Sequence, residues 1–507
     1  MVQRKGSCTN FGNCTVADSK QIVEVPETAN FICPTCSKQL AEVGGRGSRP
    51  VVPIVITLAV VVAALLLLHK QPRSVQAPSV TSAHAPGPTA NIIILRVHGS
   101  NTIGAELMPL LAEKYLEQQG ATDVRRIPGK LDETVVQGVL AGDSSPKSIE
   151  IEAHGSWTAF TDLAQGKCDV GMASRKIKPE EAAALSSLGD MTSPASEHVL
   201  GLDGIAVIVS PANPIQSLTK DQLSRIFSGA VTRWHQMLIP RGDIHVYARD
   251  AKSGTYDTFK TLVLGTGNLV SSAIRIEDSR ELSDKVASDP DAIGFIGLPY
   301  IRSAKAVAIS DSGSRPLLPT RLTVSTEDYA LSRRLYLYTP ANPSNQLTVG
   351  FVSFALSRSG QESVAENGFV AQNVTAAAIA PATDGPSEYK RITHGADRLS
   401  LDFRFRTGSA GLDNKALADL DRVVTFLTDL KYPGRNVLLI GFADSTGTGA
   451  INMALSKSRA KAVADQFAPR GLDVGLSTGF GSALPVASNA TEDGRQKNRR
   501  VEIWLKK

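Results

Sequence analysis

Motifs that define common enzyme classes are missing from this sequence of 507 residues. It has no GxSxG, HExxH or P-loop motif, and its eight histidines show no metal-ligand spacing. We therefore expect a protein that is not an enzyme. The net charge of +5 is too small for this length to indicate nucleic acid as a partner. With 42% hydrophobic and 20% charged residues, the composition excludes a wholly disordered chain.

Cysteine is also scarce, and four of the five cysteines fall within the first 36 residues. This uneven placement argues against a disulfide scaffold for the whole protein. Four thiolates on two short loops suit a structural zinc ion, although two disulfides or four unrelated thiols are alternatives. A strand is expected at Gln21–Val25, between the two pairs. We interpret residues 1–50 as a zinc-ribbon-like segment in the reducing cytoplasm, with zinc bound by Cys8, Cys14, Cys33 and Cys36.

One long hydrophobic run does occur, at residues 51–68, and it contains no charge. As a helix it would span about 27 Å, close to the hydrocarbon core of a bilayer. A cleaved signal peptide is the alternative, but 50 residues precede the run. We therefore expect a single retained transmembrane helix. Residues 69–90 are rich in proline and form an expected linker.

The pattern of strand-like and helical segments in residues 91–372 predicts an α/β domain. Several of its strands or loops end in hydroxyl-rich segments. Ile92–Val97 is a predicted strand, and a Gly-Ser-x-Thr sequence and a helix follow it. Backbone N–H groups and hydroxyls at a helix start suit an anion, and arginine adds a planar fork of donors. Four such segments contain the candidate residues Ser100, Thr102, Ser156, Ser174, Arg175, Arg249, Ser253, Gly254 and Thr255.

The phrases Asp203–Val209, Ile226–Gly229, Ala292–Gly297 and Leu331–Tyr336 make this domain resemble the periplasmic phosphate-binding protein of ABC transporters. The resemblance implies a class II solute-binding fold, with two α/β lobes joined by crossover strands and phosphate clamped between them. Arg175 departs from the family, because some members have aspartate there. An arginine would favour a more fully charged anion or pair with an internal acid. The other eight candidates map onto the phosphate cradle of the family.

Residues 373–395 are rich in alanine and proline and are predicted as a second linker. In residues 396–507 we expect strands near Leu399–Phe405 and Asn436–Ile440 and an amphipathic helix at Gly449–Phe467. Asp444 follows the second strand, 15 residues before Arg459 on that helix. An acid beside an arginine suits a zwitterionic ligand, although an ordinary surface salt bridge is the alternative.

The phrase from Gly441 to Gly447, together with the asparagine and arginine pattern up to Ile503, resembles the OmpA C-terminal family. The resemblance implies a βαβαββ domain that binds peptidoglycan non-covalently. Its paired acid and arginine, which hold the diaminopimelate of the stem peptide, map to Asp444 and Arg459. Asn452 and Arg499 are further candidates for this site. Because peptidoglycan lies outside the inner membrane, residues 69–507 are expected in the periplasm of a Gram-negative bacterium.

The sequence thus predicts a multidomain chain of the α/β and α+β classes. The leading hypothesis is a single-pass inner-membrane protein, with a cytoplasmic N-terminus, that binds phosphate or a similar oxyanion and attaches to peptidoglycan. The alternative is a periplasmic sensor or envelope scaffold whose solute-binding-like domain contacts another protein or ligand. A permease and a signalling protein both stay open as partners.

Overall fold

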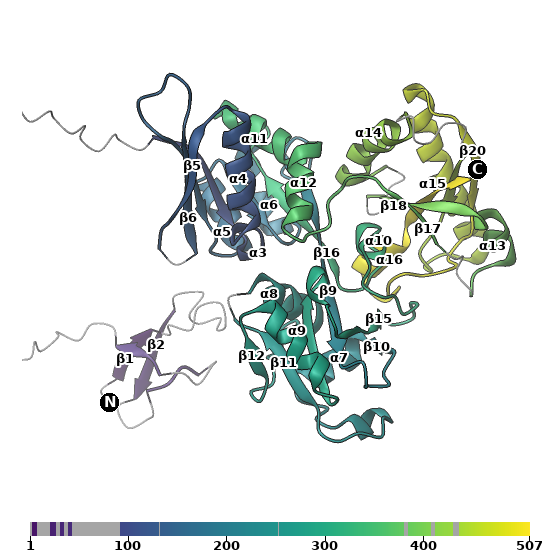
Figure 1. The fold of residues 1–507 in the computed structure, drawn as a ribbon, viewed down its shortest axis with the longest axis horizontal. Coiled ribbons are helices and arrows are strands. Elements are labelled where there is room, and N and C mark those ends of the chain that lie inside the picture. Colours follow the sequence, from purple (N-terminus) through teal and green to yellow (C-terminus); the bar gives the residue numbers. More distant parts are fainter. Residues whose placement is uncertain are drawn as a thin grey trace, which may run out of the picture. The chain divides into compact units, whose positions relative to one another are not determined.

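The computed structural model describes residues 3–7, 21–26, 31–34, 39–42, 92–130, 132–251, 253–379, 384–406, 411–428 and 436–506 (Figure 1). The chain divides into two compact units, Met1–Ala85 and Pro86–Lys507. Among the described residues, no helix has the length and apolar character needed to cross a membrane. The predicted transmembrane helix at residues 51–68 lies outside the described residues.

The first unit contains a three-stranded antiparallel sheet in the order β2-β1-β3. Its strands are β1 (Gln3–Ser7), β2 (Ile22–Pro26) and β3 (Ala41–Glu42), and β2 confirms the strand expected at Gln21–Val25. Val25, Phe31, Cys33 and Leu40 form a small buried cluster. Of the four predicted zinc ligands, Cys8, Cys14 and Cys36 lie outside the described residues.

The first lobe of the second unit is a sheet flanked by helices. Helix α4 packs on β5 and β6 and is itself covered by α12. Pro109 lies in the first turn of α4, where its missing N–H has no intrahelical partner to lose. The strands of this lobe are β4 (Ile92–Gly99), β5 (Thr122–Pro128), β6 (Glu133–Val139), β7 (Lys147–Glu152) and β8 (Val170–Ala173). Its helices are α3 (Asn101–Gly104), α4 (Leu107–Gln118), α5 (Ser156–Ala164), α6 (Pro179–Ala184), α11 (Gln346–Leu356) and α12 (Arg358–Glu366).

The second lobe has its own core around Trp234 and the stacked rings of Phe259 and Phe295. Its strands are β10 (Ser217–Thr219), β11 (His245–Arg249), β12 (Ile274–Ile276), β13 (Ala292–Gly297), β14 (Lys305–Ala306) and β15 (Ala308–Ser310). Its helices are α7 (Lys220–Phe227), α8 (Gly254–Phe259), α9 (Ser279–Ser288) and α10 (Arg321–Ser325). A π-helical turn at Lys260–Leu264 continues α8.

Two crossover strands join the lobes. β9 (Glu197–Val209) pairs with β16 (Ser332–Tyr338) through its first half and with β13 through its second half. Because β16 also pairs with β8, strands of both lobes form one eleven-stranded sheet, while β10 and β15 form a separate two-stranded sheet. The expected two-lobed architecture is confirmed.

The C-terminal domain is a five-stranded sheet in the order β17-β18-β21-β19-β20. Helices α14 and α15 contribute to the core on one face of the sheet, and α13 packs on the other face. Its strands are β17 (Ala376–Ala378), β18 (Ala396–Arg404), β19 (Asn436–Gly441), β20 (Val474–Gly479) and β21 (Arg500–Lys506). Its helices are α13 (Ser387–Thr393), α14 (Asn414–Thr428), α15 (Gly449–Phe467) and α16 (Glu492–Asn498). The expected βαβαββ order ends in two consecutive strands, but the short α16 lies between the last two strands, β20 and β21.

The predicted linker at residues 373–395 requires correction, because it contains β17 and α13. β17 pairs with β18 as an edge strand. Tyr389 and Ile392 of α13 are buried against Phe442 and Trp504. The alanine- and proline-rich composition therefore conceals a short edge strand and a seven-residue helix that complete the C-terminal domain.

Within the second unit, buried Arg334 connects the crossover strand β16 to the C-terminal domain. Its guanidinium donates to both carboxylate oxygens of Glu327 at 2.8 and 2.9 Å and to Asp413 at 2.8 Å. Burial opposes ionisation of Glu327, but the charges of Arg334, Arg404 and Lys415 outweigh burial and lower its pKa to about 2.

We expect this carboxylate to make stability sensitive to acid. A folded-state pKa of about 2, lower than the ordinary 4.5, stabilises the fold above pH 4.5. That contribution, on the order of 3 kcal/mol, is lost as the pH falls towards 2. Thermal melts between pH 5 and 2 should therefore show a steeper loss for wild type than for Glu327→Gln. Parallel curves would contradict this assignment.

Candidate functional site

The hydroxyl-rich loops of the first lobe meet at the carboxyl ends of β4, β7 and β8. The backbone N–H of Ser100 donates to Met172 O at 2.8 Å, and that of Gly155 donates to Gly99 O at 2.7 Å. The Ser156 and Ser174 hydroxyls lie 3.2 Å apart, and the N–H of Ser174 donates to Ser156 Oγ at 3.0 Å. Three loops predicted from separate sequence segments therefore converge on one place.

The second lobe contributes the end of β11 and the start of α8. Arg249 is the last residue of β11, and Ser253, Gly254 and Thr255 form the turn into α8. Arg249 Nη1 donates to Ser279 Oγ at 2.5 Å, which orients the guanidinium. Its side chain is largely buried, with 17% exposed.

The two lobes touch at Thr102 and Gly254. The Thr102 hydroxyl lies 3.4 Å from the Gly254 carbonyl oxygen. A Cβ atom added at Gly254 would lie 2.6 Å from Thr102 Cα, which is closer than real Cβ contacts come. Glycine at position 254 therefore permits the starts of α3 and α8 to approach each other.

Arg333, on the crossover strand β16, is a residue of this site that the sequence analysis missed. Its Nη2 donates to Thr102 Oγ1 at 2.8 Å, and its side chain is 7% exposed. Asp203 Oδ2 lies 3.5 Å from its Nε. Burial lowers the pKa of Arg333, although Asp203 and Asp257 favour its charged form. The sequence signal that could have found Arg333 is the pair of adjacent arginines at 333 and 334. Adjacent residues of a strand point to opposite faces, so the two arginines lie in different surroundings.

Arg175 is held by an acid outside these loops. Its two terminal nitrogens donate to both oxygens of Glu181 at 2.8 and 2.6 Å, and its guanidinium lies 5.3 Å from the Phe160 ring centroid. Two roles were considered for an arginine at this position, binding a more fully charged anion or pairing with an internal acid. In the structure, Arg175 forms the internal pair, with Glu181.

Among the described residues, two buried donor atoms in this region, Ser100 Oγ and Arg249 Nε, have no partner. Arg333 Nε has no hydrogen bond either, but it lies 3.5 Å from Asp203 Oδ2. Leaving a buried polar group unpaired typically costs about 1–3 kcal/mol, so unpaired donors at one place suit a bound acceptor. Hydroxyl, amide and guanidinium donors together can bind a tetrahedral oxyanion.

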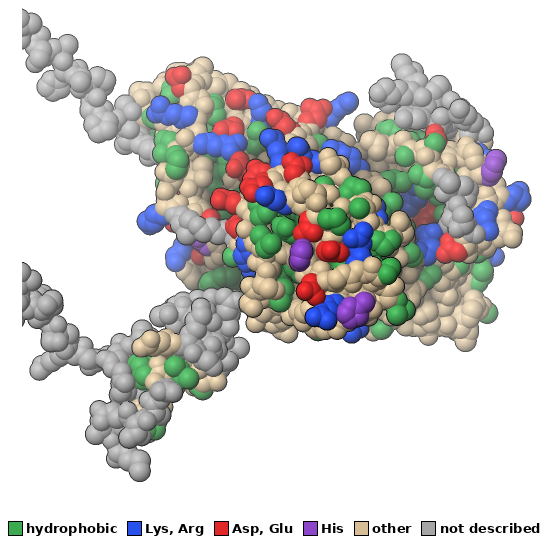
Figure 2. Space-filling model, turned by 60° about the horizontal axis from the view of Figure 1, so that its bottom comes forward, with side chains coloured by type: hydrophobic (Ala, Val, Ile, Leu, Met, Phe, Trp, Pro, Cys, Tyr) green, Lys and Arg blue, Asp and Glu red, His purple; other side chains and the backbone are tan. Residues whose placement is uncertain are grey.

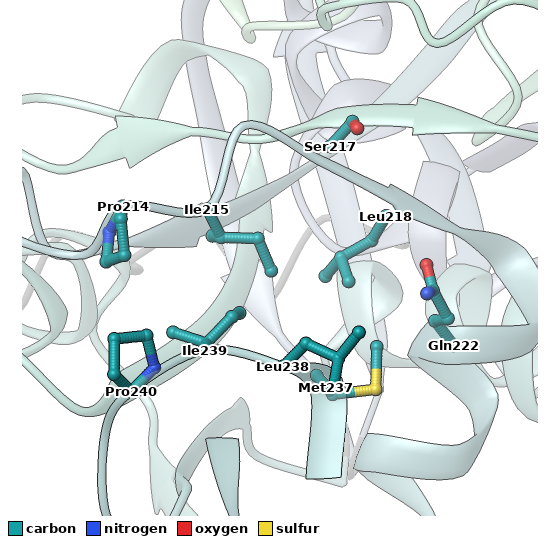
Figure 3. A pocket seen from close by; sticks show the side chains of 9 residues that line it. All are labelled: Pro214, Ile215, Ser217, Leu218, Gln222, Met237, Leu238, Ile239 and Pro240. Atoms are coloured by element: carbon teal, nitrogen blue, oxygen red, sulfur yellow. The ribbon is translucent and has the colours of Figure 1, made fainter. Parts of the chain in front are cut away.

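Nothing on the surface shown in Figure 2 supplies a broad positive field for an anion. Acidic and basic side chains are interspersed across that face. A separate surface pocket of about 320 Å³ is lined mainly by apolar side chains such as Ile215, Met237 and Leu238 (Figure 3). It lacks the convergent charged groups of the lobe interface, so any anion specificity depends on the local donors described above.

The C-terminal domain brings Asp444, Arg459 and Arg499 together at the end of β19. Asp444 Oδ2 accepts from Arg499 Nη1 at 3.1 Å, and Oδ1 accepts from the Thr446 N–H at 2.9 Å. Burial raises the pKa of Asp444, but the bonds from Thr446 and Arg499 outweigh it and leave the pKa low. Asp444 is therefore an ionised carboxylate at neutral pH.

Arg459 lies on α15 beside this carboxylate and is 8% exposed. Its Nη1 donates to Phe442 O at 3.2 Å, and its guanidinium lies 5.6 Å from the Phe405 ring centroid. Burial lowers the pKa of Arg459, while Asp444 favours its charged form. Asn452, which also lies on α15, donates to Gly447 O at 3.0 Å and so orders the loop after Asp444. Such a pair of opposite charges can receive an ammonium and a carboxylate.

The fold and these sites define a two-lobed solute-binding domain followed by a separate α/β binding domain. Residues 130–359 match the PBP superfamily domain, and residues 404–499 match the OmpA family. Protein SphX of Synechocystis sp. is 31% identical over 241 residues, which cover 44% of this chain and 70% of that protein. The chain therefore belongs to the PBP superfamily, with a PstS-like domain followed by an OmpA domain.

The chain is also similar to a second curated protein and to a solved structure. Phosphate-binding protein PstS of Borreliella burgdorferi is 25% identical over 265 residues, covering 51% of this chain and 90% of that protein. A solved ABC-type phosphate transport receptor from Vibrio cholerae has a TM-score of 0.43 and 24% identity, covering 54% of this chain and 99% of that chain. These are families of binding proteins, in agreement with the prediction that the chain is not an enzyme.

Proposed function

We propose that the two-lobed domain binds inorganic phosphate or a similar oxyanion between its lobes. The observation that carries this proposal is the pair of buried donors without a partner, Ser100 Oγ and Arg249 Nε, at the lobe interface that Arg333 also lines. The PstS relatives, which are named as phosphate-binding proteins, support phosphate as the anion. The Ser156, Ser174, Ser253, Gly254 and Thr255 loops complete the proposed cradle.

The C-terminal domain is proposed to bind peptidoglycan non-covalently. Asp444 would receive the ammonium of a diaminopimelate side chain and Arg459 its carboxylate, because their charges are opposite and Asp444 is near enough to favour the charged form of Arg459. Arg499 holds Asp444 in place. Membership in the OmpA family supports this assignment.

A topology follows from these two sites. Residues 51–68 are proposed to anchor the chain in the inner membrane, with residues 1–50 in the cytoplasm and residues 69–507 in the periplasm. Cys8, Cys14, Cys33 and Cys36 are proposed to hold a structural zinc. The described part of the first unit supports the zinc proposal, because the buried cluster of Val25, Phe31, Cys33 and Leu40 is small and a metal would add folding energy.

The proposal for phosphate is tested by calorimetry on the full chain, with phosphate and sulfate as ligands. Phosphate binding is expected, and Gly254→Ala should weaken it about tenfold because the new methyl group meets Thr102 and holds the lobes apart. Gly242→Ala, in the same lobe, is the matched control because no atom lies within 4 Å of its added Cβ. No heat with either oxyanion would refute the proposal.

A sensor is the second candidate function, and Arg334 favours it. This arginine connects a crossover strand to Asp413 of the C-terminal domain, so closure of the lobes would move a residue that the C-terminal domain binds. Under this candidate, phosphate would alter the affinity of the full chain for purified sacculi. Delivery to a permease would leave that affinity unchanged.

A further inference from the structure

Histidine and carboxylate side chains line up across three neighbouring strands of the first lobe. In the strand register, His98 of β4 lies opposite Glu152 of β7, and Glu152 lies opposite Glu133 of β6. Neighbouring strands are about 4.8 Å apart, so residues in one row are within reach of each other. Asp162 of α5 and His154, which follows β7, approach the two ends of this row.

These side chains form two groups of three that share Glu152. In the first, ligand atoms of His98, Glu152 and Asp162 all lie within 4.8 Å of one another. In the second, the same holds for Glu133, Glu152 and His154. The closest pairs are His98 Nδ1 with Asp162 Oδ2 at 2.9 Å and His154 Nε2 with Glu133 Oε1 at 3.3 Å.

The cluster carries excess negative charge. It includes Glu150, whose Oε1 lies 3.7 Å from His98 Nε2, so four carboxylates face two histidines. Within the described part of the chain, no lysine or arginine lies within ion-pair distance of these four carboxylates. Like charges directly opposite on paired strands, such as Glu133 and Glu152, are destabilising. A cation between them would remove this repulsion.

His98 supplies an independent indication of a ligand. Its side chain is 5% exposed and lies among Glu150, Glu152 and Asp162. Its Nδ1 faces Glu152 and Asp162, whereas its Nε2 is buried without a hydrogen-bond partner among the described residues and lies 3.7 Å from Glu150 Oε1. A buried nitrogen that faces a carboxylate without a hydrogen bond is a costly arrangement for structure alone.

We propose that His98, Glu133, Glu152, His154 and Asp162 form a binding site for a divalent transition-metal cation. One imidazole and two carboxylates per group suit Mn²⁺ or Zn²⁺, because these ions accept nitrogen and oxygen ligands together. Ligand atoms around a tetrahedral zinc lie roughly 3.3–3.6 Å apart, so modest side-chain shifts would close either group.

The position of this site gives it a structural consequence. His98 comes two residues before Ser100, and His154 comes two residues before Ser156. Cations bound in the two groups, which share Glu152, would therefore connect the strand ends from which two of the hydroxyl-rich loops leave. This proposal stands on the cluster itself and does not depend on which anion those loops bind.

Manganese is the suitable probe, because the cysteines of the first unit prefer softer metals. Binding of Mn²⁺ to the full chain, without phosphate, is followed by the loss of the electron paramagnetic resonance signal of the free ion. Wild type is expected to bind Mn²⁺ at micromolar concentration. Glu152→Gln, which alters both groups, should weaken binding at least tenfold, and His98→Gln should do the same.

Glu106→Gln is the matched control, since Glu106 is an exposed carboxylate of the same lobe that pairs with Arg126. Circular dichroism establishes that each variant is folded, and Glu152→Gln is the safer variant because its side chain is 32% exposed. Failure of wild type to bind Mn²⁺ at millimolar concentration would overturn the site. Equal affinities of wild type and Glu152→Gln would overturn it as well.

Discussion

Replacing Arg249 by methionine should lower the affinity for phosphate by a factor of a hundred or more. Two hydrogen bonds from a guanidinium to an anion contribute about 1.5–3 kcal/mol each, so their joint loss corresponds to roughly 10²–10⁴ in Kd. The Nε of Arg249 is buried and unpaired, and Ser279 orients the guanidinium. Calorimetry on the full chain measures the effect.

Two further variants define the role of Arg249. Arg249→Lys keeps the charge but not the fork of donors, so it should bind phosphate with intermediate affinity. Arg302→Met removes a half-exposed arginine of the same lobe, paired with Asp284, and should bind like wild type. If Arg249→Met also binds like wild type, the proposed cradle is wrong.

Replacing Arg459 by methionine should release the chain from the cell wall. The guanidinium is buried, and removing one partner of a buried charge pair, here the proposed pair of Arg459 with the ligand carboxylate, costs about 2–5 kcal/mol, or roughly 30- to 4,000-fold in affinity. Co-sedimentation of the purified protein with sacculi is the measurement. Phosphate binding should be unchanged, because Arg459 lies in a different domain from the lobe interface.

Arg470→Met serves as the matched control, since Arg470 follows the same helix but forms an ion pair with largely exposed Asp421. It should sediment with sacculi like wild type. Asp444→Asn should lose binding as Arg459→Met does, because it removes the proposed partner of the ligand ammonium. Sedimentation of both site variants at the wild-type level would exclude this pair as the wall-binding site.

Local sequence patterns predicted much of the fold, because helix capping and residue periodicity depend on residues that are close together in the chain. The helix at Gly449–Phe467 has the predicted bounds, since Thr448 caps its start and its buried residues, among them Asn452, Ser456 and Val463, recur at helical spacing. The strand at Ile92 was predicted to end at Val97, and it extends to Gly99. The helix after it is divided into α3 and α4, because the chain turns at Ala105 and Glu106.

Other features escaped the sequence analysis because long-range contacts create them. Tyr389 and Ile392 look like part of a linker until β19 and β21 provide a surface for them to pack on. Arg333 becomes part of a site only when β16 passes between the lobes. His98 and His154 have no metal-ligand spacing along the chain, yet the pairing of β4, β7 and β6 brings both to Glu152.

By itself the sequence determined the two-lobed and OmpA families and the loops that carry hydroxyls and arginines, because these depend on residues close together in the chain. The apolar run at residues 51–68 and the cysteine spacing likewise led to local predictions of a span and a zinc site. The tertiary structure alone decided which donors remain unpaired at the lobe interface, that Arg175 turns to Glu181, and that two histidines share an acidic row. Those outcomes depend on strand register and lobe contact, which bring together residues that are far apart in the sequence.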